Sequence, residues 1–344
     1  MKKTLMLAAA LCALLPFASC GGKKSDAKAS SGSGAAVEAG GSTKDADKAA
    51  EKAAKDAKKA LKGAKDAAGA FEIIAKQLAD GQTDAALSAI DAAMALVKNE
   101  KATPESLFRY ELTKDGSGVR LLGPADGATF AGTLVFPDTI EGLPVKEIEG
   151  GYGSTITSVI VPEGVEVIEI EGVGVAPFGH ELVYASLPSS LKEVRTDTGG
   201  LFEKCKNLVR IDIPADSKLT YIPKNFANKA GIKSFTIPSN VKEIGYNAFS
   251  VTALTSIEIP EGVTHIHRSA FAGCHNLEKV TLPSTLKEIK GGAFKGCSNL
   301  TEVIVPESMG KVNWSEFPED TFEGTHLNLK SQAALKAIGY TGKF

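Results

Sequence analysis

Three cysteines of this chain share one local sequence and are its most regularly placed reactive side chains. Cys205, Cys274 and Cys297 each begin a Cys-x-Asn-Leu segment, which indicates equivalent positions of a repeated unit. Stacked on neighbouring coils at about 4.8 Å, they would lie within the Cα range of a disulfide, but parallel Cβ vectors do not favour that bond. Because three thiols cannot all pair, we expect a ladder of reduced, buried thiols.

Two histidines, His265 and His267, are spaced as a metal-binding pair on one strand face. The neighbouring units could add only Glu243 or Glu288 to a weak site, so we expect solvent-facing histidines and no metal. No nucleophile, base and orienting group coincide in the repeat register. No Gly-rich loop between a strand and a helix could cradle a phosphate. We therefore expect no catalytic site and no cofactor, and a protein that is not an enzyme.

The segments that position these side chains recur along the chain. Eight prolines follow one another at steps of 22 to 26 residues. A fixed period in this range is typical of a solenoid of the leucine-rich-repeat class, in which each unit buries its apolar side only by stacking on the next. The prolines are Pro137, Pro162, Pro188, Pro214, Pro238, Pro260, Pro283 and Pro306.

Each unit predicts a strand, a second apolar pair and a turn. Residues one and three before the proline, such as Ile259 and Ile257, are apolar and should face the core, because alternate strand side chains face opposite sides. The proline lacks an N–H and ends the ladder. Val263 and Ile266 represent the second pair. An Ala-Phe turn closes the unit, and its rings should form the structural core between coils: Phe249, Phe271 and Phe294.

This pattern resembles the BspA-like leucine-rich repeats of bacterial surface lipoproteins of Bacteroidetes and treponemes. Residues 274–294 match that unit almost throughout and lack only the Gly after Ile289. The likeness covers roughly residues 107–344 and departs from the family at the insertions 150–154, 172–180 and 195–200. It implies a surface adhesin for host matrix or plasma glycoproteins, or for other bacteria.

The outward side chains of the strands are the candidate binding surface, which the resemblance makes the concave face. Tyr184 and Arg210 are residue types enriched at binding hot spots and occupy the same position on adjacent coils. Ser186 and Asp212 lie beside them, and Ile160 occupies the next coil. We expect these five side chains to be open to a protein partner, and the alternative is a generic sheet surface without one.

The N-terminus reads as an export signal. Residues 1–3 are basic in character, residues 5–17 are apolar, and Ala18-Ser19 precede Cys20. The apolar run is too short to span a bilayer. The end of the signal resembles a bacterial lipobox, which implies cleavage before Cys20 and lipidation of its sulfur. The alternative is a plain signal peptide with an incidental cysteine.

Residues 20–41 are rich in Gly, Ser, Ala and Lys and predict a flexible linker. Residues 42–101 carry an alanine seam with heptad spacing that ends in Phe71, Ile74 and Leu78, followed by a second helical stripe. This segment is either an oligomerising coiled coil or a helical stalk whose apolar end folds back as a hairpin. Alanine buries little area, which favours the second alternative.

Both ends of the repeat array have predicted caps. Residues 108–112 and 119–122 flank a Gly-containing loop and predict a β-hairpin over the first coil. Residues 331–338 predict a short helix with Ser331 as N-cap.

The expected class is α+β: a leucine-rich-repeat solenoid of about eight coils with a β-hairpin cap and a C-terminal helix, preceded by an Ala/Lys-rich helical stalk. The expected domains are 1–19 signal peptide, 20–41 linker, 42–101 helical segment, 102–330 solenoid and 331–344 C-terminal cap.

The formal net charge of −2, with lysines interleaved with acids, does not favour nucleic acid as a partner. Together these features indicate an exported bacterial lipoprotein, anchored to a membrane through Cys20, at the outer membrane or cell surface. The expected function is binding of protein ligands, with host extracellular-matrix proteins among the candidates. The alternative is a structural envelope or periplasmic spacer that acts through its helical segment.

Overall fold

The computed structural model describes residue 61 and residues 64–80, 83–97, 100–170, 176–197 and 199–344. The predicted signal peptide, Cys20, the linker and the first part of the helical segment lie outside the described residues. Residues 172–175 of the 172–180 insertion also lie outside them. The described helices and strands belong to one compact unit of the chain.

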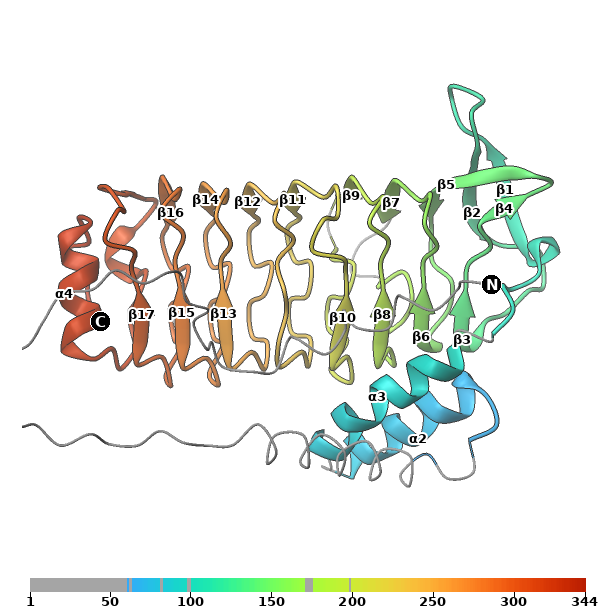
Figure 1. The fold of residues 1–344 in the computed structure, drawn as a ribbon, viewed down its shortest axis with the longest axis horizontal. Helices are drawn as coiled ribbons and strands as arrows, with labels where there is room; N and C mark the ends of the chain where they lie inside the picture. The colour runs from blue at the N-terminus through green and yellow to red at the C-terminus, as the bar shows by residue number, and fades with distance from the viewer. Residues whose placement is uncertain (1–60, 62–63, 81–82, 98–99, 171–175, 198) are drawn as a thin grey trace, which may run out of the picture. The chain divides into compact units, whose positions relative to one another are not determined.

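The strands that end at the prolines form one side of a stacked solenoid (Figure 1). They pair in parallel and in register, so that equivalent positions of successive units are direct neighbours. This confirms the predicted solenoid of about eight turns. The two sheets on this side consist of β3 (Ala131–Val135), β6 (Thr155–Ile160), β8 (Tyr184–Ser186) and β10 (Arg210–Asp212), and of β13 (Ser256–Glu258), β15 (Lys279–Thr281) and β17 (Glu302–Ile304).

The second apolar pair of each unit lies on short strands that form the other side. These strands also run parallel, and their inward residues are buried. They comprise β5 (Leu143–Glu149), β7 (Val167–Ile170) and β9 (Glu193–Thr196), and further along β11 (Tyr221–Ile222), β12 (Glu243–Ile244), β14 (His265–Ile266), β16 (Glu288–Lys290) and β18 (Asn313–Ser315).

The N-terminal cap is the predicted hairpin. After the short helix η1 (Glu105–Leu107), β1 (Phe108–Leu112) pairs antiparallel with β2 (Val119–Pro124), and β2 pairs parallel with β5. In the connecting loop the Asp115 carboxylate accepts hydrogen bonds from Thr113 and Ser117. The two-residue strand β4 (Thr139–Ile140) pairs antiparallel with β5.

The C-terminal cap differs from the expectation in one detail. Helix α4 (Leu329–Ala337) follows η2 (Pro318–Asp320), and its N-cap is Asn328, not Ser331. The Asn328 side chain accepts the N–H of Ser331 at 2.8 Å. The Ser331 hydroxyl in turn accepts the N–H of Val303 at 2.9 Å, so it fixes the helix to the last coil.

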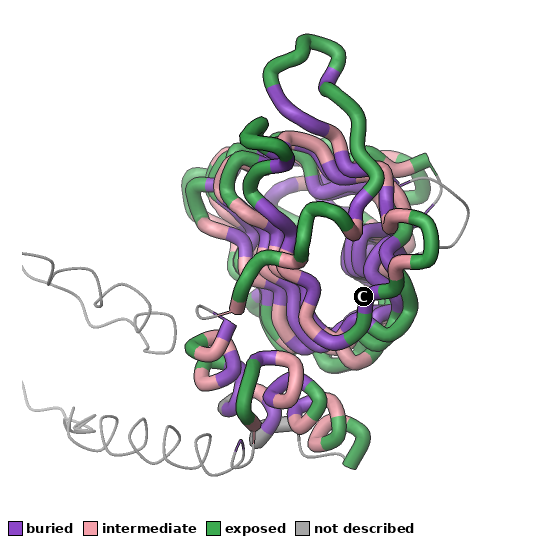
Figure 2. Tube along the Cα trace, turned by 90° about the vertical axis from the view of Figure 1, so that its right-hand side faces the viewer, coloured by how far each residue is buried: buried purple, intermediate pink, exposed green. Residues whose placement is uncertain are grey.

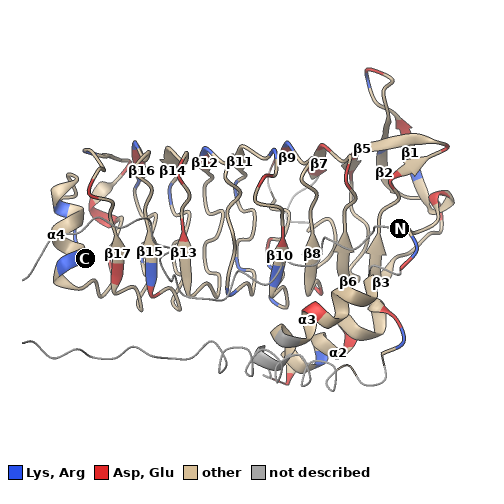
Figure 3. Cartoon of the chain, in the orientation of Figure 1, with Lys and Arg blue, Asp and Glu red and all other residues tan. Residues whose placement is uncertain are grey.

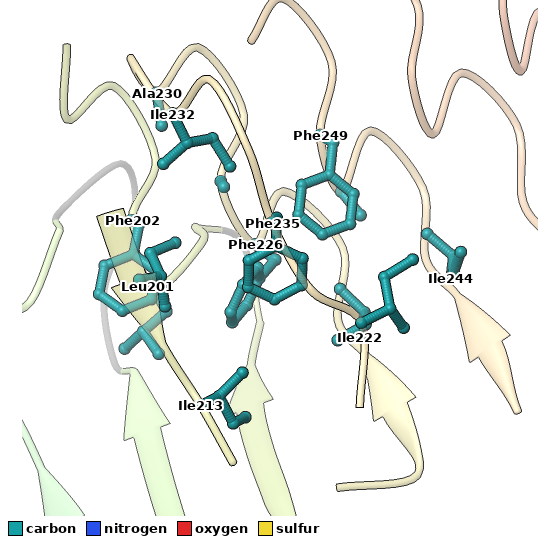
Figure 4. Close-up of a cluster of buried hydrophobic side chains, with 14 of the residues drawn as sticks. Leu201, Phe202, Ile213, Ile222, Phe226, Ala230, Ile232, Phe235, Ile244 and Phe249 are labelled. Carbon is teal, nitrogen blue, oxygen red and sulfur yellow. The ribbon is translucent and has the colours of Figure 1, made fainter. Parts of the chain in front are cut away.

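The core runs the length of the solenoid, and its most regular feature is a stack of rings. Phe271 lies between Phe249 and Phe294, with ring centroids 5.4 and 5.3 Å away and interplanar angles of 11° and 2°. Figure 2 shows buried residues lining the inside of the coils. In the middle coils Phe226 and Phe235 fill the space around Phe249 (Figure 4).

Two helices precede the solenoid and form a hairpin. Helix α2 (Ala67–Ala79) begins at the N-cap Asp66, and α3 (Thr83–Val97) packs against it. The Glu100 carboxylate accepts the N–H of Ala67 at 2.8 Å and ties the two ends together. None of the described helices is long and apolar enough to cross a membrane. Of the expected apolar stripes, all described residues except the half-buried Ala64 and Leu78 are buried in the cluster that the helices share with the solenoid: Ala67, Phe71, Ile74, Ala86, Ile90, Ala93 and Val97. Ala70 and Ala89, which lie outside the expected stripes, are buried there too.

Candidate binding face on strands β3 to β10

The predicted binding residues do lie together on the outward side of the solenoid. Tyr184 of β8 pairs with Ser158 of β6 and with Arg210 of β10. Two residues further along, Ser186 pairs with Ile160 and with Asp212. We call the outward side chains of these strands, with Val183 and Val209 immediately before β8 and β10, the β3–β10 face.

Tyr184 is not open to solvent, contrary to the expectation from strand alternation. Its ring leaves the solenoid core but is 0% exposed, because it stacks on Phe71 of α2 at 5.5 Å and 15°. Its hydroxyl donates to the Asp212 carboxylate at 2.8 Å. Burial raises the pKa of Tyr184 well above its usual range, and the Asp212 charge adds to the effect. Tyr184 is therefore a neutral hydrogen-bond donor beneath the helical hairpin.

Arg210 joins this tyrosine to the second helix. Its Nε donates to Asp212 at 2.6 Å and its Nη1 to Asp91 of α3 at 2.7 Å. Partial burial opposes the charge of Arg210, but the hydrogen bonds that it donates to both carboxylates raise its pKa above the usual value. Tyr184, Asp212, Arg210 and Asp91 thus form one connected chain of hydrogen bonds between the strands and α3.

The remaining predicted residues border this network. Ile160 is half-buried and packs against the apolar cluster that the hairpin shares with the face. Ser186 is half-buried beside Tyr184. Asp212 bonds both Tyr184 and Arg210, so it positions the ring and the guanidinium, and its side chain is 36% exposed.

The sequence analysis missed Val183 and Val209, which are 0% and 3% exposed beneath the hairpin. A signal for them exists in the sequence. Both stand five residues before their prolines, where the later units carry polar residues. The two apolar residues therefore mark the part of the surface that another element covers. The later residues at this position are Lys233, Thr255, Glu278 and Thr301.

The same side of the solenoid is open over its C-terminal strands. Figure 3 shows charged residues on β13, β15 and β17 but few on β3, β6 and β8. Ser256, Glu258 and Lys279 are exposed, and Lys279 pairs with Glu302 at 3.0 Å. The charged outward residues begin on β10, where Arg210 still contacts Asp91 of α3, and they continue on the strands beyond the hairpin.

The three repeat cysteines are free and buried. The thiols of Cys274 and Cys297 donate to the carbonyl oxygens of Phe249 and Phe271 on the preceding coil, both at 3.1 Å. Burial raises the pKa of the Cys205 thiol to about 12. The Cys205 thiol donates to the carbonyl oxygen of Gly179 at 3.3 Å, so all three thiols donate their S–H to a buried carbonyl oxygen.

The two histidines lie on the opposite side of the solenoid. His267 Nε2 is 2.9 Å from the Glu243 carboxylate, and His265 Nε2 is 3.8 Å from that of Glu288. Among the residues that the structure describes, no group of three or more His, Cys, Asp or Glu side chains is placed to hold a metal ion.

Comparisons with solved structures find leucine-rich-repeat proteins of bacteria. The chain is similar to a crystal structure of a leucine-rich-repeat protein from T. pallidum, with 26% identity, 71% of this chain and 99% of that chain covered, and a TM-score of 0.50. Structures from Bacteroides ovatus and Faecalibacterium prausnitzii, both described as leucine-rich proteins, match at 17% and 14% identity. They cover 66% and 71% of this chain, 81% and 99% of theirs, with TM-scores of 0.24 and 0.25.

No curated protein matches the sequence at a significant level. The model of the BspA-type leucine-rich-repeat region matches residues 152–274 and 198–330, in six copies. These matches span more than half of the chain and fall on the stacked coils described above. The chain belongs to the BspA-type leucine-rich-repeat family.

Proposed function

We propose that this protein is a non-enzymatic, lipid-anchored protein of the bacterial envelope that binds protein partners through the β3–β10 face of its solenoid. Solenoids of this kind present extended surfaces for binding. The candidate partners are host matrix or plasma glycoproteins, or proteins of other bacteria, as the family resemblance implies. The proposed anchor is a lipid on Cys20, after export and cleavage of the signal peptide.

One observation carries the proposal: the β3–β10 face already holds a protein segment. The Phe71 ring lies flat on Tyr184, and Asp91 pairs with Arg210 at 2.7 Å. Tyrosine and arginine are enriched among the residues that dominate binding energies, and such residues cluster in desolvated contacts. The chemistry of this face therefore suits an apolar ring and a carboxylate on a partner.

The experiment compares the full chain with the double variant Tyr184→Ala, Arg210→Ala for binding to immobilised matrix proteins. We expect the double variant to lose at least about tenfold in affinity, because hot-spot truncations commonly cost 2 kcal/mol or more. Circular dichroism checks that the solenoid remains folded. The matched control is Ser256→Ala with Lys279→Ala, which removes the equivalent pair of positions on β13 and β15 and should retain binding.

The alternative function is a structural spacer that acts through the helical segment 42–101. The observation in its favour is the alanine seam with heptad spacing in that segment. If the double variant binds like the wild type while deletion of residues 42–101 abolishes binding, the helical segment is the functional element and the proposal for the β3–β10 face is wrong.

A further inference from the structure

The helical hairpin and the solenoid have separate cores. The main apolar cluster runs from Phe108 to Tyr340 and contains no residue of α2 or α3. The hairpin belongs to a second cluster, to which the solenoid contributes buried Val183, Tyr184 and Val209, with Ile160 at its margin. Departure of the hairpin would therefore leave the main core and its strand ladders intact.

The contact that holds the hairpin in place is modest. Five of the nine residues that α2 and α3 bury in this cluster are alanines, which offer little apolar area. The Asp91 side chain is 79% exposed, so its ion pair with Arg210 is screened by water and contributes little. Two polar atoms in or beside this region, Gln77 Oε1 and Thr157 Oγ1, are buried without a hydrogen-bond partner. Opening of the hairpin should thus require less free energy than unfolding of the solenoid.

An open hairpin would uncover a surface with definite chemistry. Val183, Tyr184, Val209 and Ile160 would form an apolar patch, and the Arg210 guanidinium would lose the Asp91 carboxylate. A contiguous apolar patch bordered by polar groups is typical of a protein-binding site. The α2–α3 hairpin, which covers this patch now, indicates what kind of segment fits it. That segment is a helix with an apolar face, an aromatic ring that stacks on Tyr184 and a carboxylate that reaches Arg210.

Resting on the function proposed above, we propose that the β3–β10 face binds an amphipathic helix of a partner protein, and that the α2–α3 hairpin is a displaceable cover that competes for the same site. The apparent affinity for the partner is then reduced by the fraction of molecules in which the hairpin is docked. Binding strengthens when the hairpin is weakened, and fails when the hairpin is fixed.

The first experiment measures opening without any ligand, in the full chain. Val183→Cys places a thiol beneath the hairpin, and the native thiols of Cys205, Cys274 and Cys297 report unfolding of the solenoid. Val159→Cys on β6 is the matched control, since Val159 is 0% exposed in the main core. Under native conditions we expect the thiol at position 183 to react with a maleimide at least about tenfold faster than the others, because local opening is less costly than global unfolding. Equal rates at positions 183 and 159 would overturn the displaceable cover.

The second experiment tests the occupant. The probe is a fluorescent peptide with the sequence of residues 67–97, which carries both Phe71 and Asp91. Phe71→Ala in the full chain weakens the cover and should raise affinity for the probe by about tenfold relative to the wild type. A probe peptide with Phe71→Ala is the matched control and should bind at least about tenfold more weakly.

A disulfide lock completes the test. A Cβ at Gly132 would lie 3.2 Å from the Ala68 Cβ, a little closer than the roughly 3.5–4.5 Å between the Cβ atoms of a disulfide, so Ala68→Cys with Gly132→Cys can join α2 to β3 once the two move apart by a few tenths of an ångström. Gly132 has φ +67°, so a melting curve of the reduced variant first checks that the strained cysteine is accepted. We expect the oxidised form to lose probe binding and the reduced form to regain it.

Equal probe binding by the oxidised and reduced forms would overturn the competition. The outcomes for the two proposals remain distinct. If Tyr184→Ala with Arg210→Ala loses binding of matrix proteins while the lock changes nothing, the partner contacts the exposed part of Arg210 beside the docked hairpin, and only the displaceable cover is wrong.

Discussion

The ring of Phe271 is enclosed on both sides by other rings and is 0% exposed. Replacing it with alanine removes both stacking contacts and leaves a cavity between three coils. We expect Phe271→Ala to lower the free energy of unfolding by about 3–5 kcal/mol, measured by guanidinium chloride denaturation.

Phe317→Ala is the matched control for this prediction. The Phe317 side chain is 60% exposed, lies outside the ring stack and has its ring centroid 5.4 Å from the Arg268 guanidinium, so the same substitution should lower the free energy of unfolding by no more than about 1 kcal/mol. If both substitutions lower the free energy of unfolding equally, the register that places Phe271 between Phe249 and Phe294 is wrong.

At the same scale, the sequence predicts which side chains leave the core but not what covers them. The alternation along β8 correctly directs Tyr184 away from the interior. Its burial depends on Phe71, which is more than one hundred residues earlier in the chain. No local sequence pattern shows that residues so far apart in the chain are in contact. The available clue was compositional: Val183 and Val209 are apolar where later units have Thr255 and Glu278.

At the scale of elements, a glutamate clamps one coil to the next. The Glu261 carboxylate, directly after Pro260, accepts the backbone N–H and the hydroxyl of Ser284 on the following coil, at 2.8 and 2.9 Å. Glu163 makes the same pair of bonds to Ser189. The Ser284 bonds lower the pKa of Glu261 below its usual 4.5. The clamp is therefore made by the charged carboxylate.

A group whose pKa is lowered in the folded state contributes stability above its unfolded pKa and loses it as the pH falls through the folded value. We expect Glu261→Gln to melt at a lower temperature than the wild type at pH 7, and the difference to shrink as the pH falls below 4.5. Calorimetry across this range measures the change.

The control for the clamp is Glu307→Gln. Glu307 follows Pro306 in the same way, but β17 is the edge strand of its sheet and packs against α4 on its outer side, not against a strand of a further coil. Its substitution should leave the melting temperature nearly unchanged at both ends of the pH range. A difference for Glu261→Gln that stays constant with pH would show that the charge of this carboxylate does not matter.

The elements themselves were largely predictable because the proline period fixes both the strand ends and the register. The β-hairpin cap also followed from its loop residues. The start of α4 did not, because Asn328 and Ser331 are both good N-cap residues, and the choice depends on a tertiary bond. The Ser331 hydroxyl accepts the N–H of Val303, which only the folded last coil places nearby.

At the scale of the whole molecule, the proposed membrane anchor lies in the residues that precede the described unit. Cys20, directly after Ala18-Ser19 in a lipobox-like context, lies outside the described residues and remains the predicted anchor. Several acyl chains would hold the protein on a membrane, whereas a single chain binds only marginally. We expect the wild type to fractionate with membranes and Cys20→Ala to appear in the soluble fraction or as an unprocessed precursor.

Two measurements complete this prediction. Mass spectrometry of the mature N-terminus should find a lipid-modified Cys20, and an N-terminus at another residue would exclude the anchor. Protease added to intact cells should cleave the solenoid if it faces outward, as the proposed binding of external proteins requires. Cys205→Ser offers a control among the cysteines, since Cys205 is buried in the solenoid core and its loss should leave fractionation unchanged. A solenoid that resists protease on intact cells but is cleaved after lysis would place it behind a membrane, where a spacer could act but a receptor for external proteins could not.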